Sequence, residues 1–358
     1  VAAETACPAC VAANAAAICS DGDCRIDRCN VGFGDCNAVY ADGCETPLTS
    51  PSNCGTCGVR CSGAVCSAGT CVRQRSCVAE SERGCGMGLV LGGAFEMGSA
   101  EASVGGVLSG RVAVSSIIVD THEVTVARFR RFWNIGHPAP SMPVRYPNGT
   151  AIAPGPEVLE PLTSARDSQC NWSAGQASRE EHPLNCVNWA TALAFCVWDG
   201  GRLPTEAELE YLSRHRAVDG SPSPRRFPWG NEPPVEMYST YPRSVPCERA
   251  QFEECVGEDG ARTRRVGRFS SNGAFFDIAG NVAEWAADSE GVFGSHPCWA
   301  PVPVNLTDPV CVDPGVTRAA RGGGFAAVGA SSLHGSNRVF RAASTAEPEL
   351  GFRCVRSP

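Results

Sequence analysis

The chain has 358 residues, enough to bury a sizeable core and to form one large domain beside a smaller one. Its formal net charge of −8 is spread along the sequence, which argues against a nucleic-acid partner. All 30 basic residues are arginine, so chemistry that needs a Schiff-base lysine is excluded.

Cysteine is the strongest compositional signal, with 14 cysteines in residues 1–85 and eight in residues 170–354. Even counts at this density predict a disulfide framework and an oxidising compartment. Zinc binding in a cytosolic protein is the alternative, because "CGTCGVRC" contains a CxxC pair, but no second pair follows at zinc-finger spacing. The apolar runs are too short to span a bilayer. We therefore expect a protein that is secreted or held at the cell surface, with no membrane span.

Residues 1–76 predict a small disulfide-rich module, because large apolar residues are scarce there and disulfides must replace a core. Its phrases "GDCRIDRCNVGFGDCNAVYADGCET" and "NCGTCGVRCSGAVCSAGTC" resemble cysteine-rich repeats of secreted myxobacterial proteins. Some of its oxygens could gather around calcium. The alternative that we favour is that they belong to solvated turns. These residues are Asp35, Asn37, Asp42 and Glu45.

Residues 77–84 are charged and polar and predict a linker, and residues 85–358 predict one mixed α and β domain. A short strand with a glycine turn is expected in 88–99, and another strand in 112–125. After residue 215, proline, glycine and turn signals predict few regular elements.

Three helices are expected in this domain. Thr125 predicts the start of a helix over 126–134. A second helix follows Asn188 and is expected to end at Gly200. Thr205 and Glu208 form a capping box that predicts the start of a third helix. The apolar stripe of the second helix is Trp189, Leu193, Cys196 and Val197.

Seven blocks of the large domain occur in the order seen in the formylglycine-generating enzyme family, the sulfatase-modifying factors. They are "GGAFEMGS", "HEVTVARFRRF", "HPLNCVNWATALAFCVWDGGRLPTEAELEY", "FPWGNE", "FDIAGNVAEW", "RGGGF" and "LGFRCV". The resemblance implies an α+β, loop-rich domain related to C-type lectins over residues 85–358. Propensity alone predicts only an α+β, loop-rich chain.

The catalytic cysteines of that family are absent from the sequence. Family members that make formylglycine carry two cysteines just after the RGGS or RGGG stretch, where two thiolates suit copper(I). No cysteine lies between Cys311 and Cys354, and Ser332 is neither a soft ligand nor redox active. We therefore expect no catalytic residues and no copper, and a non-catalytic binding or structural protein. The alternatives are a formylglycine-generating oxidoreductase and a subunit of an extracellular assembly.

A binding role points to residues 321–340. Arg321, His334 and Arg338 could meet an acidic group on an extracellular glycan, peptide or protein. The arginines could equally be buried tethers to backbone carbonyls, and a lone histidine in a loop is more often a surface residue.

The resemblance also implies structural calcium, a hard cation that takes several oxygen ligands. The matching positions are Asp277, Gly280, Val282 and Glu284, with a weaker second set at Asp259 and Ala261. The alternative is that Asp277 caps a turn and that Glu284 pairs with an arginine.

Four disulfides are expected in the large domain. The family resemblance implies Cys196–Cys354, and proximity in the sequence favours Cys170–Cys186, Cys247–Cys255 and Cys298–Cys311. One or two free buried cysteines are the alternative.

Overall fold

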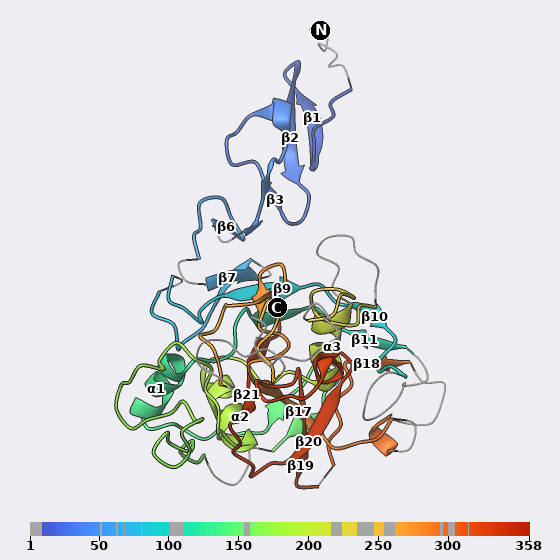
Figure 1. The fold of residues 1–358 in the computed structure, drawn as a ribbon. Coiled ribbons are helices and arrows are strands. Elements are labelled where there is room, and N and C mark those ends of the chain that lie inside the picture. Colours follow the sequence, from blue (N-terminus) through green and yellow to red (C-terminus); the bar gives the residue numbers. More distant parts are fainter. Residues whose placement is uncertain are drawn as a thin grey trace, which may run out of the picture. The chain divides into compact units, whose positions relative to one another are not determined.

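The computed structural model divides the chain into two compact units, Val1–Gln74 with Pro358 and Arg75–Ser357 (Figure 1). The residues that it describes are 9–50, 52–61, 64–67, 69–79, 81–100, 111–153, 158–215, 224–234, 247–253, 262–293, 296–299, 305–313 and 315–358. Among these residues, no helix is both long enough and apolar enough to cross a bilayer.

The first unit consists of short antiparallel hairpins fastened by disulfides. Its elements are β1 (Ala15–Ser20), β2 (Asp23–Cys29), β3 (Phe33–Gly34), η1 (Tyr40–Asp42), β4 (Thr46–Pro47), β5 (Thr49–Ser50), β6 (Asn53–Cys54), β7 (Ala64–Ser67) and β8 (Thr70–Arg73). Its described disulfides are Cys10–Cys24, Cys29–Cys44, Cys36–Cys57, Cys54–Cys66 and Cys61–Cys71. Its buried apolar cluster consists of cysteines, so the disulfides do replace a conventional core.

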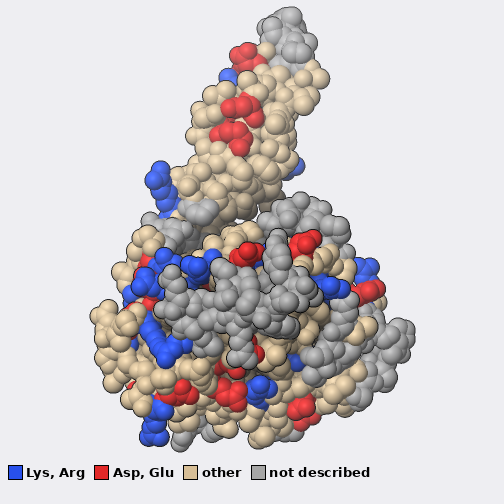
Figure 2. All heavy atoms as spheres, viewed as in Figure 1, with Lys and Arg blue, Asp and Glu red and all other residues tan. Residues whose placement is uncertain are grey.

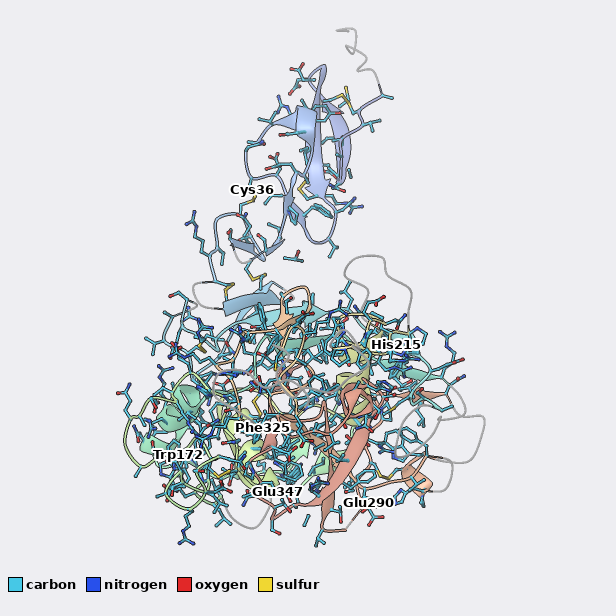
Figure 3. The ribbon with its side chains drawn as sticks, viewed as in Figure 1. Cys36, Trp172, His215, Glu290, Phe325 and Glu347 are labelled. Atoms are coloured by element: carbon cyan, nitrogen blue, oxygen red, sulfur yellow. A yellow bond between two sulfur atoms is a disulfide. The ribbon has the colours of Figure 1, made fainter. Side chains whose placement is uncertain are left out.

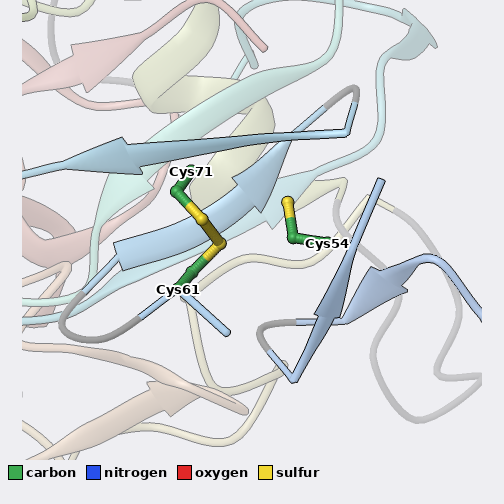
Figure 4. A group of neighbouring side chains, drawn as sticks. All are labelled: Cys54, Cys61 and Cys71. Carbon is green, nitrogen blue, oxygen red and sulfur yellow. A yellow bond between two sulfur atoms is a disulfide. The ribbon is translucent and has the colours of Figure 1, made fainter. Parts of the chain in front are cut away.

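Three cysteine sulfurs of this unit, from Cys54, Cys61 and Cys71, lie within 4.8 Å of one another (Figure 4). Cys61 is bonded to Cys71, and Cys54 is bonded to Cys66. Sulfur in a disulfide is not the thiolate that a metal requires. The cluster is therefore a structural crossing of two disulfides.

The acidic residues of the first unit serve its turns. Asp35 Oδ1 accepts a hydrogen bond from the Ala38 N–H at 2.6 Å, and Asn37 Nδ2 donates to Asp42 Oδ2 at 2.8 Å. Glu45 Oε1 accepts from the Cys36 N–H at 3.2 Å. These are the contacts that the turn interpretation predicts.

Residues 77–84 are not a linker, in contrast to the prediction. Cys77 and Cys85 form a disulfide, and Glu82 pairs with Arg131 of the first helix of the second unit. The adjacent Ser76 N–H donates to Asp199 Oδ1 at 2.6 Å. Glu82, one of the polar residues that suggested a linker, is thus the partner of a half-buried arginine, which composition alone does not reveal.

The predicted helices and their caps are confirmed. They are α1 (Val126–Asn134), α2 (Trp189–Trp198) and α3 (Glu206–Arg214). Thr125 Oγ1 accepts from the Arg128 N–H at 3.2 Å, and Thr205 forms both bonds of the capping box with Glu208. Helix α2 ends one residue earlier than expected, at the cap Asp199, and Gly200 follows with a φ of +86°.

The strands of the second unit form several small sheets. They are β9 (Met87–Val90), β10 (Gly93–Phe95), β11 (Val112–Val114), β12 (Ile117–Asp120), β13 (Val144–Arg145), β14 (Ala151–Ile152), β15 (Ser270–Asn272), β16 (Phe275–Phe276), β17 (Ala283–Ser289), β18 (Leu306–Thr307), β19 (Thr317–Arg321), β20 (Arg338–Ala342), β21 (Leu350–Gly351) and β22 (Val355–Arg356), with the 3₁₀ turns η2 (Pro297–Trp299) and η3 (Ala330–Leu333). The larger ones have the orders β20-β19-β17-β21, β22-β12-β9 and β10-β11-β18.

Two strand predictions need correction. The single strand expected in 112–125 is two, β11 and β12, and they lie in different sheets. The region after residue 215, expected to be irregular, supplies the whole four-stranded sheet. Its strand β17 is buried along its entire length, so its sequence "AEWAADS" lacks the alternation that marks a half-buried strand.

The core of the second unit packs α1 and α2 against β17. Its main cluster includes Phe129, Phe195, Trp189 and Trp285, all buried. The structure contains three of the predicted disulfides, Cys196–Cys354, Cys170–Cys186 and Cys298–Cys311. Cys247 is also disulfide-bonded, but its expected partner, Cys255, lies outside the described residues. The loop-rich α+β fold is thus closed by crosslinks around a small apolar core.

Candidate functional site

The glycine run "RGGG" turns the chain back from the end of β19. Gly322 and Gly323 take φ values of +93° and +66°, a region that favours glycine. Phe325, which follows the run, is fully buried, and its N–H donates to Asn281 O at 2.9 Å (Figure 3). The segment predicted to bind a ligand is therefore anchored at its start.

Two of the three predicted ligand-binding residues are buried ion-pair partners. Arg321 and Arg338 face each other across β19 and β20, and their exposed fractions are 3% and 0%. Both pair with Glu206 at the start of α3, with Nε–Oε1 distances of 3.2 Å from Arg321 and 2.9 Å from Arg338. Arg338 Nη1 also donates to the Gly291 carbonyl at 2.8 Å. These contacts match the buried-tether alternative, and burial removes both arginines from a ligand-binding surface.

The third residue, His334, lines a pocket of about 390 Å³. The pocket is formed where residues 334–336 pass α3 and the segment that follows it. The Gly335 N–H donates to Arg226 O at 2.9 Å, and a Cβ at Gly335 would collide with Ser213. The close approach that glycine permits thus brings His334 beside the basic residues near the end of α3.

The pocket is cationic and polar. Besides His334, its described lining is Ser99, Arg214, Pro224, Arg225, Arg226, Asn231 and Ser336, and none of these residues is acidic. Arg214 pairs with Glu210 at 2.5 Å, and Arg226 is exposed. Guanidinium groups bind carboxylate, sulfate and phosphate groups through paired N–H donors. The arrangement therefore favours an anionic ligand group.

The sequence indicated His334 but missed the arginines of this pocket. They lie about a hundred residues before His334 in the sequence, and no motif marks them. Elsewhere the visible face of the molecule carries basic and acidic side chains interspersed (Figure 2). Only the tertiary packing of α3 against residues 334–336 identifies the pocket.

The predicted calcium ligands lie in a buried acidic cluster. Asp277 Oδ2 accepts from the Gly267 N–H at 2.6 Å and Oδ1 from the Phe269 N–H at 3.1 Å. Both oxygens of Glu284 accept from Arg353. These are the contacts of the alternative, a capped turn and an arginine pair. The weaker set, Asp259 and Ala261, lies outside the described residues.

A third carboxyl, Glu123, joins this cluster and was not predicted. Its oxygens accept from Asn281 Nδ2 at 2.6 Å and from the Val282 N–H at 3.2 Å. Burial, together with the nearby charges of Asp277 and Glu284, raises the pKa of Glu123 well above its ordinary value. Burial also raises the pKa of Asp277 to about 6. Burial raises the pKa of Glu284 as well, and the charge of Arg353 opposes the rise in all three carboxyls, so three acids share one guanidinium. Carboxylate oxygens are among the ligands that calcium prefers, so this cluster is the candidate calcium site.

Comparisons with known proteins connect the large domain to a family. The model of the sulfatase-modifying factor enzyme 1-like domain matches residues 74–358. Formylglycine-generating enzyme of Bos taurus is 32% identical over 225 residues, 55% of this chain and 56% of that protein, so the match spans little more than half of that relative. Inactive C-alpha-formylglycine-generating enzyme 2 of Bos taurus is 31% identical over 117 residues, 32% of this chain and 35% of that protein. The solved structure of PvdO from Pseudomonas aeruginosa shares the fold, with a TM-score of 0.51 and 22% identity over 77% of this chain and 96% of that chain.

Proposed function

Because the chain belongs to the sulfatase-modifying factor enzyme 1-like family yet has no cysteine between Cys311 and Cys354, we propose that it is a non-catalytic binding protein. The two thiolates that would hold copper(I) and exchange with a substrate cysteine are missing together. The retained caps, crosslinks and glycine turn keep the scaffold intact. A relative whose name describes it as inactive is consistent with this use of the fold.

The observation that carries the proposal is the position of His334. The cysteine-free segment that follows the glycine run contributes His334 and Ser336 to a pocket in which Arg226 is exposed, with the buried Arg214 and Arg225 in its wall. A rigid, crosslinked frame lowers the entropy cost of presenting such a pocket. We propose that the ligand group is a carboxylate, sulfate or phosphate on an extracellular glycan, peptide or protein.

The disulfides indicate an oxidising compartment, and the proposal places the protein outside the bacterial cytoplasm, secreted or at the cell surface. A structural calcium in the cluster of Asp277, Glu284 and Glu123 is part of the proposal. It is supported by the excess of buried carboxyls over Arg353. Calcium would stabilise the fold and would take no part in a reaction.

Two assays test the proposed function. Incubation with copper and a CxPxR peptide should give no formylglycine, and its formation would overturn the proposal. A glycan array, read beside acidic and neutral peptides, should show binding to anionic ligands only.

Variants connect the binding to the pocket. Arg226→Ala should weaken binding about tenfold or more, because a hydrogen bond to a charged group contributes about 1.5–3 kcal/mol. Arg145→Ala removes an exposed arginine of β13, outside the pocket, and should leave binding unchanged. Equal losses in the two variants would show that the ligand responds only to overall charge.

A further inference from the structure

A second pocket, of about 370 Å³, lies where the chain leaves β17. Its lining includes Glu290, His296 and Asp313, of which Glu290 is labelled in Figure 3. His296 also contacts Cys311 Sγ of the Cys298–Cys311 disulfide, so one titratable side chain connects the pocket to a buried disulfide sulfur. None of these residues lines the first pocket, which contains His334 and Arg226.

The imidazole of His296 lies between a carboxylate and a sulfur atom. Its Nε2 is 3.1 Å from Asp313 Oδ2, and its Nδ1 is 3.6 Å from Cys311 Sγ and 3.3 Å from the Cys298 nitrogen. With one proton on Nε2, the ring donates to Asp313 and accepts the Cys298 N–H. With both nitrogens protonated, it presents an N–H to Cys311 Sγ. Asp313 therefore positions a proton carrier against one sulfur of the disulfide.

The two sulfurs have different surroundings. Cys298, in η2, is partly exposed, whereas Cys311 is fully buried. The backbone of Cys311 is fixed to β17, because its N–H donates to Asp288 Oδ1 at 2.8 Å and its carbonyl accepts the Ser289 N–H at 2.8 Å. Because Cys298 is the more exposed residue of the pair, attack by a thiolate is expected at its sulfur, with Cys311 as the leaving group.

A second donor lies near the leaving sulfur. Trp299 is fully buried, and its Nε1 has no hydrogen-bond acceptor among the described residues. A Cβ at Gly291 would lie 2.8 Å from this nitrogen and 3.2 Å from Cys311 Sγ, so both atoms border the same glycine. A buried thiolate is costly without hydrogen-bond donors, and here the imidazole of His296 and the indole of Trp299 both lie near Cys311 Sγ.

We propose that Cys298–Cys311 is a thiol–disulfide exchange site for a low-molecular-weight thiol. The thiol loses its proton to solvent, and the thiolate attacks Cys298 Sγ, forming a new sulfur–sulfur bond as the bond to Cys311 breaks. The electron pair of the broken bond stays on Cys311 Sγ, which takes the proton held at His296 Nδ1. The products are a mixed disulfide on Cys298 and a Cys311 thiol that can return its proton to His296 Nδ1, which leaves a thiolate beside an imidazolium. A second thiol resolves the mixed disulfide, so that two thiols are oxidised and one protein disulfide is reduced.

Two other disulfides of the second unit serve as references for the rate of reduction. Cys196–Cys354 and Cys170–Cys186 have fully buried sulfurs. In the oxidised full-length protein, limiting dithiothreitol followed by alkylation and peptide mass spectrometry should show Cys298–Cys311 reduced before either of these pairs. Reduction of Cys298–Cys311 no faster than that of Cys196–Cys354 would overturn the proposal.

The role of His296 is tested by substitution. His296→Gln should slow reduction of this pair about 100-fold, the size of a general-acid contribution, and Asp313→Asn should slow it less. The control His137→Gln changes a histidine that stacks on Trp133 and should have no effect. The reduced protein should show thiolate absorbance at neutral pH that His296→Gln removes, because an adjacent imidazolium stabilises a thiolate. A His296→Gln protein with unchanged rate and absorbance would contradict the mechanism.

The same three side chains could instead be metal ligands, since the ligand atoms of His296, Cys298 and Cys311 lie within 4.8 Å of one another. The reduced protein is therefore also tested with zinc and with oxidised glutathione. Rapid reoxidation by glutathione supports the exchange site. Tight zinc uptake with no reaction with glutathione would replace the proposal with a metal site.

Discussion

Arg353 donates hydrogen bonds to both carboxylate oxygens of Glu284, with Nε 2.8 Å from Oε1 and 2.7 Å from Oε2, and both side chains are buried. Its Nη2 also donates to the carbonyls of Phe276 and Asp277 at 3.0 and 3.2 Å. One guanidinium thereby connects the last residues of the chain, β17 and the loop before it.

Glu284→Gln should destabilise the protein by about 3–5 kcal/mol, because it leaves Arg353 buried without its charged partner. The measurement is urea unfolding followed by circular dichroism. Glu347→Gln is the matched control, since Glu347 pairs with Arg341 at a half-exposed position and should contribute under about 1 kcal/mol. Similar losses in the two variants would contradict the structural role of the buried pair.

Calcium should raise the melting temperature, and EDTA should lower it. The reason is that a cation relieves repulsion among Glu123, Asp277 and Glu284, and ligand binding to the folded state stabilises it. Metal analysis by mass spectrometry should find calcium, and Asp277→Asn should abolish the response. An unchanged melting temperature in EDTA, with no metal found, would show that the arginine pair and capped turn suffice.

Stability should fall between about pH 4 and pH 7 through Asp288. Burial is the main cause that raises the pKa of Asp288 from 3.8 to about 7, and the negative charge of Glu206 adds to the rise. The positive charge of Arg338 opposes it. The folded state binds this proton more tightly than the unfolded state does, so its stabilising effect is complete below pH 4 and is lost as the pH rises through 7. Unfolding free energies measured across this range should show the decrease, and Asp288→Asn should reduce it, leaving the part of the slope that comes from Asp277, whose pKa burial also raises. A variant that keeps the full slope would assign the effect to another group.

Unreduced protein, unfolded in guanidinium chloride, should show no free thiols. The described residues contain no free cysteine, and the eight cysteines from 170 onward form an even set. Titration with a chromogenic disulfide measures this directly, with reduced protein as the positive control. Two or more thiols per chain would mean that Cys247 or a cysteine of the first unit lacks a stable partner.

Local signals predicted local structure well. Thr125 and Thr205 cap helices as expected, because a cap depends on residues within one turn. Longer-range electrostatics were not predictable: Arg128 pairs with both Asp120 and Asp199 at 2.8 and 2.9 Å, and all three are fully buried. Buried charges look like surface residues in a sequence until their partners are known.

The candidate sites show the same limit. The glycine run and His334 were identifiable, but the arginines of the pocket come from the far end of α3 and the residues after it. His296 and Asp313 are 17 residues apart, and the Cys298–Cys311 crosslink between them brings their side chains together. The crosslink was expected from the sequence, but the contacts of His296 with Asp313 and Cys311 depend on the path of the loop, which no local pattern encodes.

The bond between Cys196 and Cys354 spans 158 residues and has a consequence for proteolysis. A single cut anywhere between these two cysteines gives two polypeptides that stay covalently attached to each other. Nicked protein should therefore migrate as one full-size band on a non-reducing gel and separate into fragments only after reduction. In an environment rich in proteases, a surface loop in this stretch can therefore be cut while the disulfide keeps the two fragments, and the aromatic core that they share, in one molecule.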